Sequence, residues 1–173
     1  CCYKTGAIDR LVFSLAGILS EIEDSKRRLL ENFGENLGIF LQIHDDFCDI
    51  CSLNRELIGN KPIGNDISEG KKSLVNIIAL NNLKLGDKNK LLDILNEKTC
   101  DMERIKEAIK LIKKSTALEK TIKEVEKISD ELKSLISIII NEEECKTMIN
   151  FLDSMTNNIK NKNLEFNENE INN

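Results

Sequence analysis

Three carboxylates and an amide lie within one strongly apolar run of the sequence. A helix over residues 37–49 would place Gly38, Gln42, Asp45 and Asp49 within a stripe about 60° wide, with Asp46 beside it. Apolar residues on the other faces indicate a helix surrounded by protein, where carboxylates persist only if paired, hydrogen-bonded or metal-bound. Carboxylate oxygens favour Mg²⁺, which completes its coordination with water and substrate phosphates. The run predicts a Mg²⁺ site for a phosphate-bearing substrate; the alternative is a solvated acidic face.

A glycine-rich loop over residues 57–73 follows this helix and contains the only proline of the chain. Its glycines permit positive φ angles or close backbone approach, and the proline stiffens the segment. Lys61, Asp66 and Lys71 would then be held in place, adding two cations and another acid to the site. The alternative is an ordinary surface connection between helices. The glycines concerned are Gly59, Gly64 and Gly70.

These segments resemble the second half of the trans-isoprenyl diphosphate synthases, the polyprenyl synthetase family. Residues 37–49 are similar to the family's second aspartate-rich signature, and Gly59-x-Lys61-x-x-Gly64-x-Asp66-x-x-Glu69-Gly70-Lys71 is similar to the loop that follows it. Near the start, Lys4-Thr5-Gly6-Ala7 resembles the lysine–threonine motif of the family. The motifs cover roughly residues 1–80. Leu41, Cys48 and Ser73 differ from the commoner family residues, but none of these changes removes a metal or phosphate group.

The resemblance implies a prenyltransferase that condenses an allylic diphosphate with isopentenyl diphosphate through Mg²⁺-assisted ionisation. It implies that Asp45, with Asp49 or Asp46, binds Mg²⁺. Diphosphate-binding residues are implied to be Lys4, Thr5, Gln42, Lys61 and Lys71. Lys4, Thr5 and Gln42 are also implied to be catalytic, with Thr5 and Gln42 directing oxygen dipoles at the developing carbocation. His44 is the only histidine, and this mechanism requires none.

The family's first aspartate-rich motif has no match here, so the chain is expected to be a C-terminal fragment, a truncated gene model or one part of a split assembly. It would carry a half-site, and whether that half-site is active alone does not follow from these residues. The resemblance implies a farnesyl-, geranylgeranyl- or polyprenyl-type diphosphate synthase, usually a homodimer, with a hetero-oligomer as the other arrangement. Alternatives are a noncatalytic helical partner subunit and a terpene cyclase, although cyclases typically lack the paired lysine pattern. Product chain length does not follow from these residues.

The expected fold is an all-α helical bundle of the isoprenoid-synthase type, here its C-terminal half. Residues 1–160 are expected to form part of one synthase domain, and the asparagine-rich residues 161–173 a disordered tail. Apolar spacing at Ile8, Leu11, Val12, Leu15 and Ile18 predicts the first helix. The predicted helices cover residues 7–23, 26–52, 74–83, 88–95 after an Asp87 cap, 101–114 from an Asp101 cap, 116–140 and 142–159. The helix over 116–140 suits a bundle core better than a coiled-coil arm.

Charge, hydropathy and cysteine content limit the classes of function and location that the chain could have. A net charge of −5 argues against nucleic-acid binding as the main task, and no apolar run reaches the roughly 18 residues of a membrane span. The six cysteines include Cys48 and Cys51 in a C-x-x-C pair, but no second pair gives zinc-finger spacing. They are expected to act as small buried hydrophobes in a reducing compartment. Cytoplasm is the default location, and organelle targeting stays open because a leader would belong to the missing N-terminus.

Overall fold

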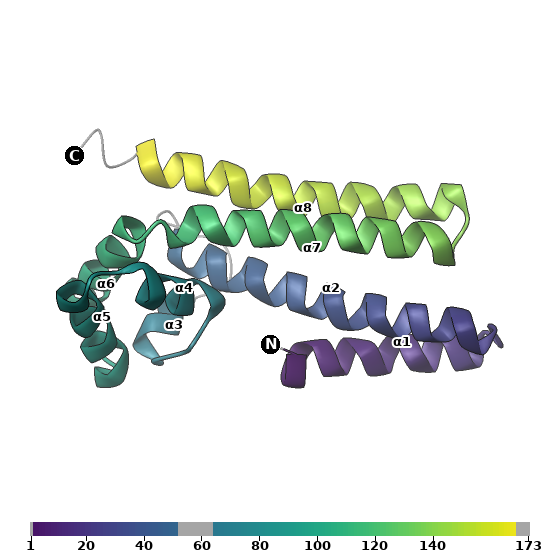
Figure 1. Cartoon of the computed structure of the whole chain (residues 1–173), viewed down its shortest axis with the longest axis horizontal. Helices are drawn as coiled ribbons and strands as arrows, with labels where there is room; N and C mark the ends of the chain where they lie inside the picture. The colour runs from purple at the N-terminus through teal and green to yellow at the C-terminus, as the bar shows by residue number, and fades with distance from the viewer. Residues whose placement is uncertain (1, 52–63, 169–173) are drawn as a thin grey trace. The chain divides into compact units, whose positions relative to one another are not determined.

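Helices make up every regular element in the computed structural model, which describes residues 2–51 and 64–168 (Figure 1). This confirms the predicted all-α class for the described residues. Within these ranges no helix combines the length and apolar character needed to cross a membrane. The elements are η1 (Cys2–Gly6), α1 (Ala7–Leu19), α2 (Asp24–Cys51), α3 (Asn65–Ser68), α4 (Leu74–Asn82), α5 (Leu85–Glu97), α6 (Met102–Lys114), α7 (Ala117–Ile139) and α8 (Glu142–Glu168).

The chain divides into two compact units, and each is described by itself. The first unit contains the residues up to His44 together with Glu124–Asn158. The second contains Asp45–Lys123 and the residues from Ile159 onward. Helices α2, α7 and α8 therefore contribute residues to both units.

In the first unit, helix α1 lies alongside the N-terminal part of α2 (Figure 1). Phe13 and Phe33 meet edge to face with ring centroids 5.4 Å apart, a geometry that aromatic quadrupoles favour. The Ser14 hydroxyl donates a hydrogen bond of 2.7 Å to the Glu31 carboxylate. Close approach of the backbones depends on Gly38, because a Cβ there would lie 3.0 Å from the carbonyl oxygen of Thr5.

The apolar residues that predict helix α1 form an outward face. Each of these side chains is at least half exposed, and Leu19 at the end of the helix is 83% exposed. The helix exists as predicted from Ala7, but its contacts with α2 use other positions, including Phe13 and Gly17. The exposed set is Ile8, Leu11, Val12, Leu15 and Ile18.

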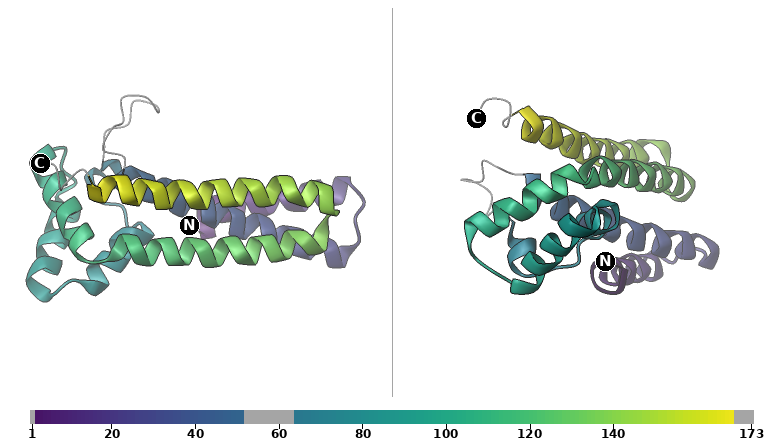
Figure 2. Two further views of the ribbon diagram at one scale, coloured as in Figure 1. Left: turned by 90° about the horizontal axis from the view of Figure 1, so that it is seen from above. Right: turned by 60° about the vertical axis from the view of Figure 1, so that its left-hand side comes forward.

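Within the first unit, helices α7 and α8 run antiparallel and side by side (Figures 1 and 2). Within the first unit, the Lys133 ammonium lies 2.5 Å from an Asp153 carboxylate oxygen and joins the two helices. Val125, Leu132 and Ile136 of α7 are buried, as expected for an apolar stripe that repeats at spacings of three and four.

Helix α8 continues to Glu168, nine residues beyond the end near Ile159 that composition suggests. The reason is tertiary: in the second unit Phe166 is buried, and the Lys113 ammonium lies 4.8 Å from its ring centroid. Residues 161–168 of the predicted tail are therefore helical. Residues 169–173 lie outside the described part of the chain.

The second unit contains the short helices α3 to α6, which pack on one another. The predicted Asp101 cap of α6 is confirmed, because its carboxylate accepts the Glu103 N–H at 2.9 Å. The predicted Asp87 cap is wrong: α5 begins at Leu85 after an N-cap at Lys84. Asp87 instead lies in the first turn, where a negative charge favours the helix dipole, and pairs with Lys114 at 2.7 Å.

Candidate functional site

The three aspartates near the end of α2 differ in exposure. Asp46 and Asp49 are buried, at 5% and 6% exposure, whereas Asp45 is exposed. The helix therefore presents one carboxylate to solvent and directs two into the second unit. Both buried acids take part in interactions within the protein. This accords with the expectation that carboxylates inside an apolar helix need partners.

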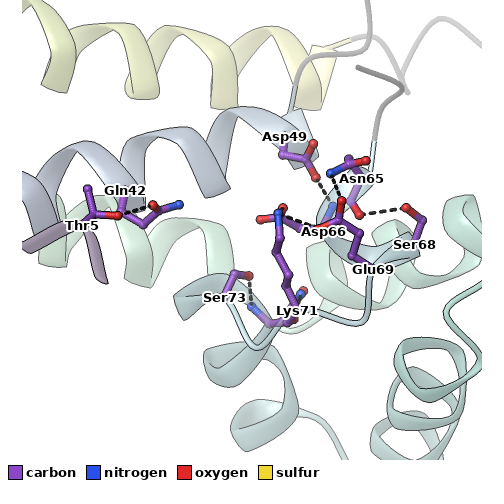
Figure 3. Close-up of polar contacts among 10 residues, drawn as sticks. Thr5, Gln42, Asp49, Asn65, Asp66, Ser68, Glu69, Lys71 and Ser73 are labelled. Atoms are coloured by element: carbon purple, nitrogen blue, oxygen red, sulfur yellow. Dashed lines mark hydrogen bonds and ion pairs between the residues drawn. The ribbon is translucent and has the colours of Figure 1, made fainter. Parts of the chain in front are cut away.

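Asp49 connects the end of α2 to the second half of the glycine-rich loop, where α3 begins (Figure 3). Its Oδ2 accepts the backbone N–H of Asp66 at 2.9 Å, and its backbone carbonyl accepts the N–H of Gly64 at 3.1 Å. The Asp49 carboxylate therefore accepts a hydrogen bond from an N–H in the first turn of α3, a position where anionic acceptors are favourable. Helix α3 begins at Asn65, sixteen positions after Asp49, and the hydrogen bond from Asp66 to Asp49 holds its first turn against α2.

Lys71 reaches back to this same segment (Figure 3). Its Nζ lies 2.6 Å from Asp66 Oδ1 and 3.0 Å from Glu69 Oε2, and its backbone N–H donates to the Asp66 carbonyl at 2.8 Å. The hydrogen bond to Asp66 raises the pKa of the Lys71 ammonium above its usual range, against a smaller opposing effect of burial. With its side chain 48% exposed, Lys71 is a fixed cation that still faces solvent.

Two glycines of the loop have the positive φ angles that the sequence predicts. Gly64 has φ +71° and Gly70 has φ +65°. A Cβ at Gly70 would also collide with the Leu95 carbonyl oxygen of α5, so both conformation and space require glycine there. The turn at Gly70 therefore fixes the position of the Lys71 backbone. Gly59, Lys61 and Pro62 lie outside the described residues.

The first unit holds the other group of predicted site residues. The Thr5 hydroxyl donates a hydrogen bond of 2.9 Å to the Gln42 Oε1, which ties η1 to α2 (Figure 3). The family resemblance implies that both side chains face a substrate, which stays a prediction; the structure shows that they contact each other. Lys4 beside them is exposed and, across residues 2–51 and 64–168, pairs with no acid.

No group of three or more His, Cys, Asp or Glu side chains within the described ranges is arranged to hold a metal ion. Mg²⁺ typically takes only one or two protein carboxylates together with substrate phosphates. The carboxylates at the end of α2 supply suitable oxygen donors, with exposed Asp45 as the accessible one. The magnesium assignment of Asp45, Asp46 and Asp49 stays a prediction.

Sequence reasoning assigned no role to Asn76, which lies behind Lys71. Asn76 is fully buried, and its Nδ2 donates a hydrogen bond of 3.0 Å to the backbone carbonyl of Lys71. The available signal was a single amide within the apolar run Leu74–Leu80. Asp66 was expected near the site, but its two contacts with Asp49 and Lys71 were not foreseen.

The C-x-x-C pair lies at the end of α2 as two buried thiols that form no disulfide within the described residues. Burial, with Cys48 nearby, raises the pKa of the Cys51 thiol well above its usual range. A thiol held in its neutral form is a poor nucleophile and metal ligand. Cys48 and Cys51 therefore match the predicted role of small hydrophobic residues.

Comparison with known proteins decides the family. The model of the polyprenyl synthetase family matches residues 1–112. This chain belongs to the polyprenyl synthetase family. A short chain isoprenyl diphosphate synthase of Methanocaldococcus jannaschii is 36% identical over 112 residues, which are 65% of this chain and 34% of that protein. A geranylgeranyl diphosphate synthase of Sulfolobus acidocaldarius is 34% identical over 64% of this chain and 33% of its own length. The chain thus spans about a third of these relatives.

Solved structures support the same fold. A geranylgeranyl pyrophosphate synthase from Bacteroides thetaiotaomicron aligns with a TM-score of 0.74 at 23% identity, covering 88% of this chain and 50% of that one. A geranylgeranyl pyrophosphate synthetase from Pyrococcus horikoshii gives a TM-score of 0.73 at 24% identity, over 88% and 46% of the two chains. The expected fold, about half of an isoprenoid-synthase bundle, is confirmed.

Proposed function

We propose that this polyprenyl synthetase chain supplies one diphosphate-binding half-site of a prenyltransferase that joins an allylic diphosphate to isopentenyl diphosphate. The observation that carries the proposal is the chain of contacts from Asp49 through Asp66 to Lys71. It fixes a half-exposed cation by hydrogen bonds to the end of the helix that bears the exposed Asp45. The two relatives described above are isoprenyl-type diphosphate synthases, and they supply the proposed substrate class.

The residues of each unit have their own proposed roles. In the second unit, Lys71 neutralises diphosphate oxygens, a role proposed also for Lys61, which lies outside the described residues. In the first unit, Lys4 is proposed to bind diphosphate oxygens, and Thr5 and Gln42 to direct oxygen dipoles at a developing carbocation. Asp45, supported by Asp46 and Asp49, is the proposed Mg²⁺ ligand. Bound Mg²⁺ would supply charge stabilisation for the departing diphosphate. These groups cover anion binding and cation stabilisation, and the chain's only histidine is not needed for either.

Turnover is proposed for an assembly that also contains the rest of the family fold, either as a homodimer or as a hetero-oligomer. The chain spans about a third of the length of these relatives, so the activity of the whole fold is a proposal. The contacts of Lys71 with Asp66 and Glu69 equally suit the second candidate, a noncatalytic partner subunit that keeps the diphosphate half-site. Binding and turnover must therefore be measured separately.

The test is calorimetric titration of the 173-residue chain with inorganic diphosphate, with and without Mg²⁺. Asp45→Asn should weaken the Mg²⁺-dependent affinity by about tenfold or more, because it removes the accessible anionic oxygen. Asp93→Asn on α5 is the matched control, since Asp93 is an exposed aspartate of the same unit, and it should leave affinity within about twofold. Equal affinities for wild type and Asp45→Asn would remove Asp45 from the metal site.

In the assembled enzyme, Asp45→Ala should lower turnover by orders of magnitude while leaving the helical circular dichroism nearly unchanged. Asp45 is exposed, so its loss should not disturb packing. Normal turnover in that variant would remove Asp45 from the proposed mechanism. Diphosphate binding by this chain without turnover in any assembly would favour the partner subunit.

A further inference from the structure

Asn76 is a buried amide with only part of its hydrogen-bonding capacity satisfied. Its side chain has 0% exposure, its Nδ2 donates to the Lys71 carbonyl at 3.0 Å, and its backbone N–H donates to the capping Ser73 hydroxyl at 3.3 Å. Its Oδ1 is buried and, among the described residues, has no hydrogen-bond partner. Leaving a buried acceptor unsatisfied is unfavourable, so this amide carries a cost that an apolar side chain would avoid.

The donor half of the amide fixes a particular peptide group. The two backbone groups of Lys71 are both bound from inside the unit, the N–H by the Asp66 carbonyl at 2.8 Å and the C=O by Asn76. The ammonium then reaches Asp66 Oδ1 at 2.6 Å. With both backbone groups held, the lysine side chain starts from a fixed Cα direction. Without Asn76, the Lys71 carbonyl loses the side-chain hydrogen bond that it accepts within the unit.

We infer that Asn76 is a positioning residue, which holds the Lys71 ammonium in a fixed place for an anionic diphosphate ligand. The inference rests on the proposed function for the ligand, and on the contacts alone for the positioning. Ordering a free lysine side chain opposes binding, because lysine loses much rotamer freedom when it is immobilised. Asn76 removes part of this cost before the ligand arrives. The charge of the site is unaffected by the amide.

This role predicts an unusual combination of effects for Asn76→Leu. The variant removes the unsatisfied Oδ1 and places an apolar group of similar size in an apolar setting, while the carbonyl of exposed Lys71 can bind water instead. Stability should therefore stay the same or increase. Affinity for Mg²⁺ with inorganic diphosphate should fall by about three- to tenfold, since the lysine must be ordered on binding. A residue needed only for packing would lower both.

The position of Lys71 can be followed without any ligand by competitive acetylation and mass spectrometry. Lys72 is the internal reference, because it is exposed and forms no ion pair within the described part of the chain. In the wild type Lys71 should react more slowly than Lys72, since it is held by Asp66 and Glu69. In Asn76→Leu the ratio of Lys71 to Lys72 labelling should rise by about threefold or more. Asn76→Gln keeps an amide donor and should restore much of the wild-type ratio.

Asn81→Leu is the matched control, because Asn81 is an exposed asparagine of the same helix. It should change neither the labelling ratio nor the affinity. An unchanged ratio in Asn76→Leu would overturn the inference, as would a raised ratio accompanied by a lower denaturation midpoint. If Asn76→Leu does not fold, Asn76→Ala replaces it, and failure of both to fold would show a packing role and overturn the inference.

The proposed function has its own outcome in the same experiment. Saturating Mg²⁺ and inorganic diphosphate should slow acetylation of wild-type Lys71 relative to Lys72. Absence of that protection would contradict diphosphate binding at Lys71, while the ligand-free labelling ratios would still decide whether Asn76 positions the lysine.

Discussion

The acids of α2 show what spacing can and cannot establish for single residues. Their spacing along the helix fixes the angles between Asp45, Asp46 and Asp49, and these follow from the sequence. Which acid faces solvent depends on the neighbours of the helix, and here Asp49 is buried and bonded to Asp66 of the glycine-rich loop. The predicted cluster is therefore one exposed carboxylate and two buried ones.

Thr5→Val tests the link between the two polar residues of the first unit. Valine has nearly the shape of threonine but no hydroxyl, so the half-buried Gln42 loses the donor that lies 2.9 Å from its Oε1. The free energy of unfolding should fall by about 1 kcal/mol, the typical contribution of one such hydrogen bond. Chemical denaturation followed by circular dichroism would measure the change.

Thr5→Ser is the control, because it keeps a hydroxyl and should recover most of the lost stability. If Thr5→Val unfolds at the same denaturant concentration as the wild type, water replaces the hydroxyl and the Thr5–Gln42 hydrogen bond does not contribute to stability.

At the scale of helices, the sequence predicts which helices exist better than it predicts where each helix ends. The apolar repeats locate the helices, and Asp101 correctly marks the start of α6 because its cap is a local hydrogen bond. The end of α8 was missed because Phe166 is held by Lys113 from another helix, 53 positions away in the chain. Composition near a terminus carries no information on such a contact. The Asn76–Lys71 contact was missed for a different reason, since an isolated amide in an apolar run is compatible with several caps and turns.

Gly38→Ala tests how closely η1 and α1 approach α2. A Cβ at this position would lie 2.5 Å from Asp9 Oδ2 and 3.0 Å from both the Thr5 carbonyl oxygen and Gly6 Cα. Two of these are backbone atoms, which cannot rotate away. Overpacking of this kind costs about 1–3 kcal/mol, whereas the better helix propensity of alanine returns up to about 1 kcal/mol. A net loss of about 1 kcal/mol is expected in the free energy of unfolding.

Gly86→Ala on α5 is the matched control of opposite sign. No atom lies within 4 Å of its would-be Cβ, so only helix propensity acts and a gain of up to about 0.5 kcal/mol is expected. Equal effects of the two substitutions would show that the first unit tolerates separation of η1 from α2. A nuclear magnetic resonance comparison of the Thr5 and Gln42 signals would reveal that separation directly.

On the scale of the whole molecule, the exposed face of α1 marks a further limit of sequence patterns. Amphipathic spacing identifies an apolar face but not the element that covers it. The spacing at Leu11, Val12 and Leu15 is that of a helix with a buried side, yet all three are at least half exposed. Family membership and fold class survive this difference, because they depend on motif order and helix content.

Stability of the chain should depend on pH at both extremes. Hydrogen bonds from Lys114 and Arg104 lower the pKa values of Asp87 and Glu97. Their contribution is present above the usual carboxyl pKa and is lost as pH falls through the lowered values. At the other extreme, the hydrogen bond to Asp153 raises the pKa of Lys133 above 10.5, so its contribution is complete below pH 10.5 and is lost above it.

Part of the stability lost at alkaline pH can be assigned to the Lys133 ion pair between α7 and α8. Lys133→Met should lower the free energy of unfolding by up to about 1 kcal/mol at pH 7, because the partly buried ammonium no longer bridges to Asp153. The gap between wild type and variant should narrow as pH rises above 10.5, since wild-type Lys133 then loses its proton. Lys127→Met on the same helix removes an exposed lysine that pairs with no acid among the described residues, and its curve should run parallel to that of the wild type. Denaturant titrations at pH 7 and pH 11.5 would give the difference in free energy of unfolding between the wild type and each variant. If the difference for Lys133→Met does not change with pH, the methylene chain of the lysine, and not its charge, joins the helices.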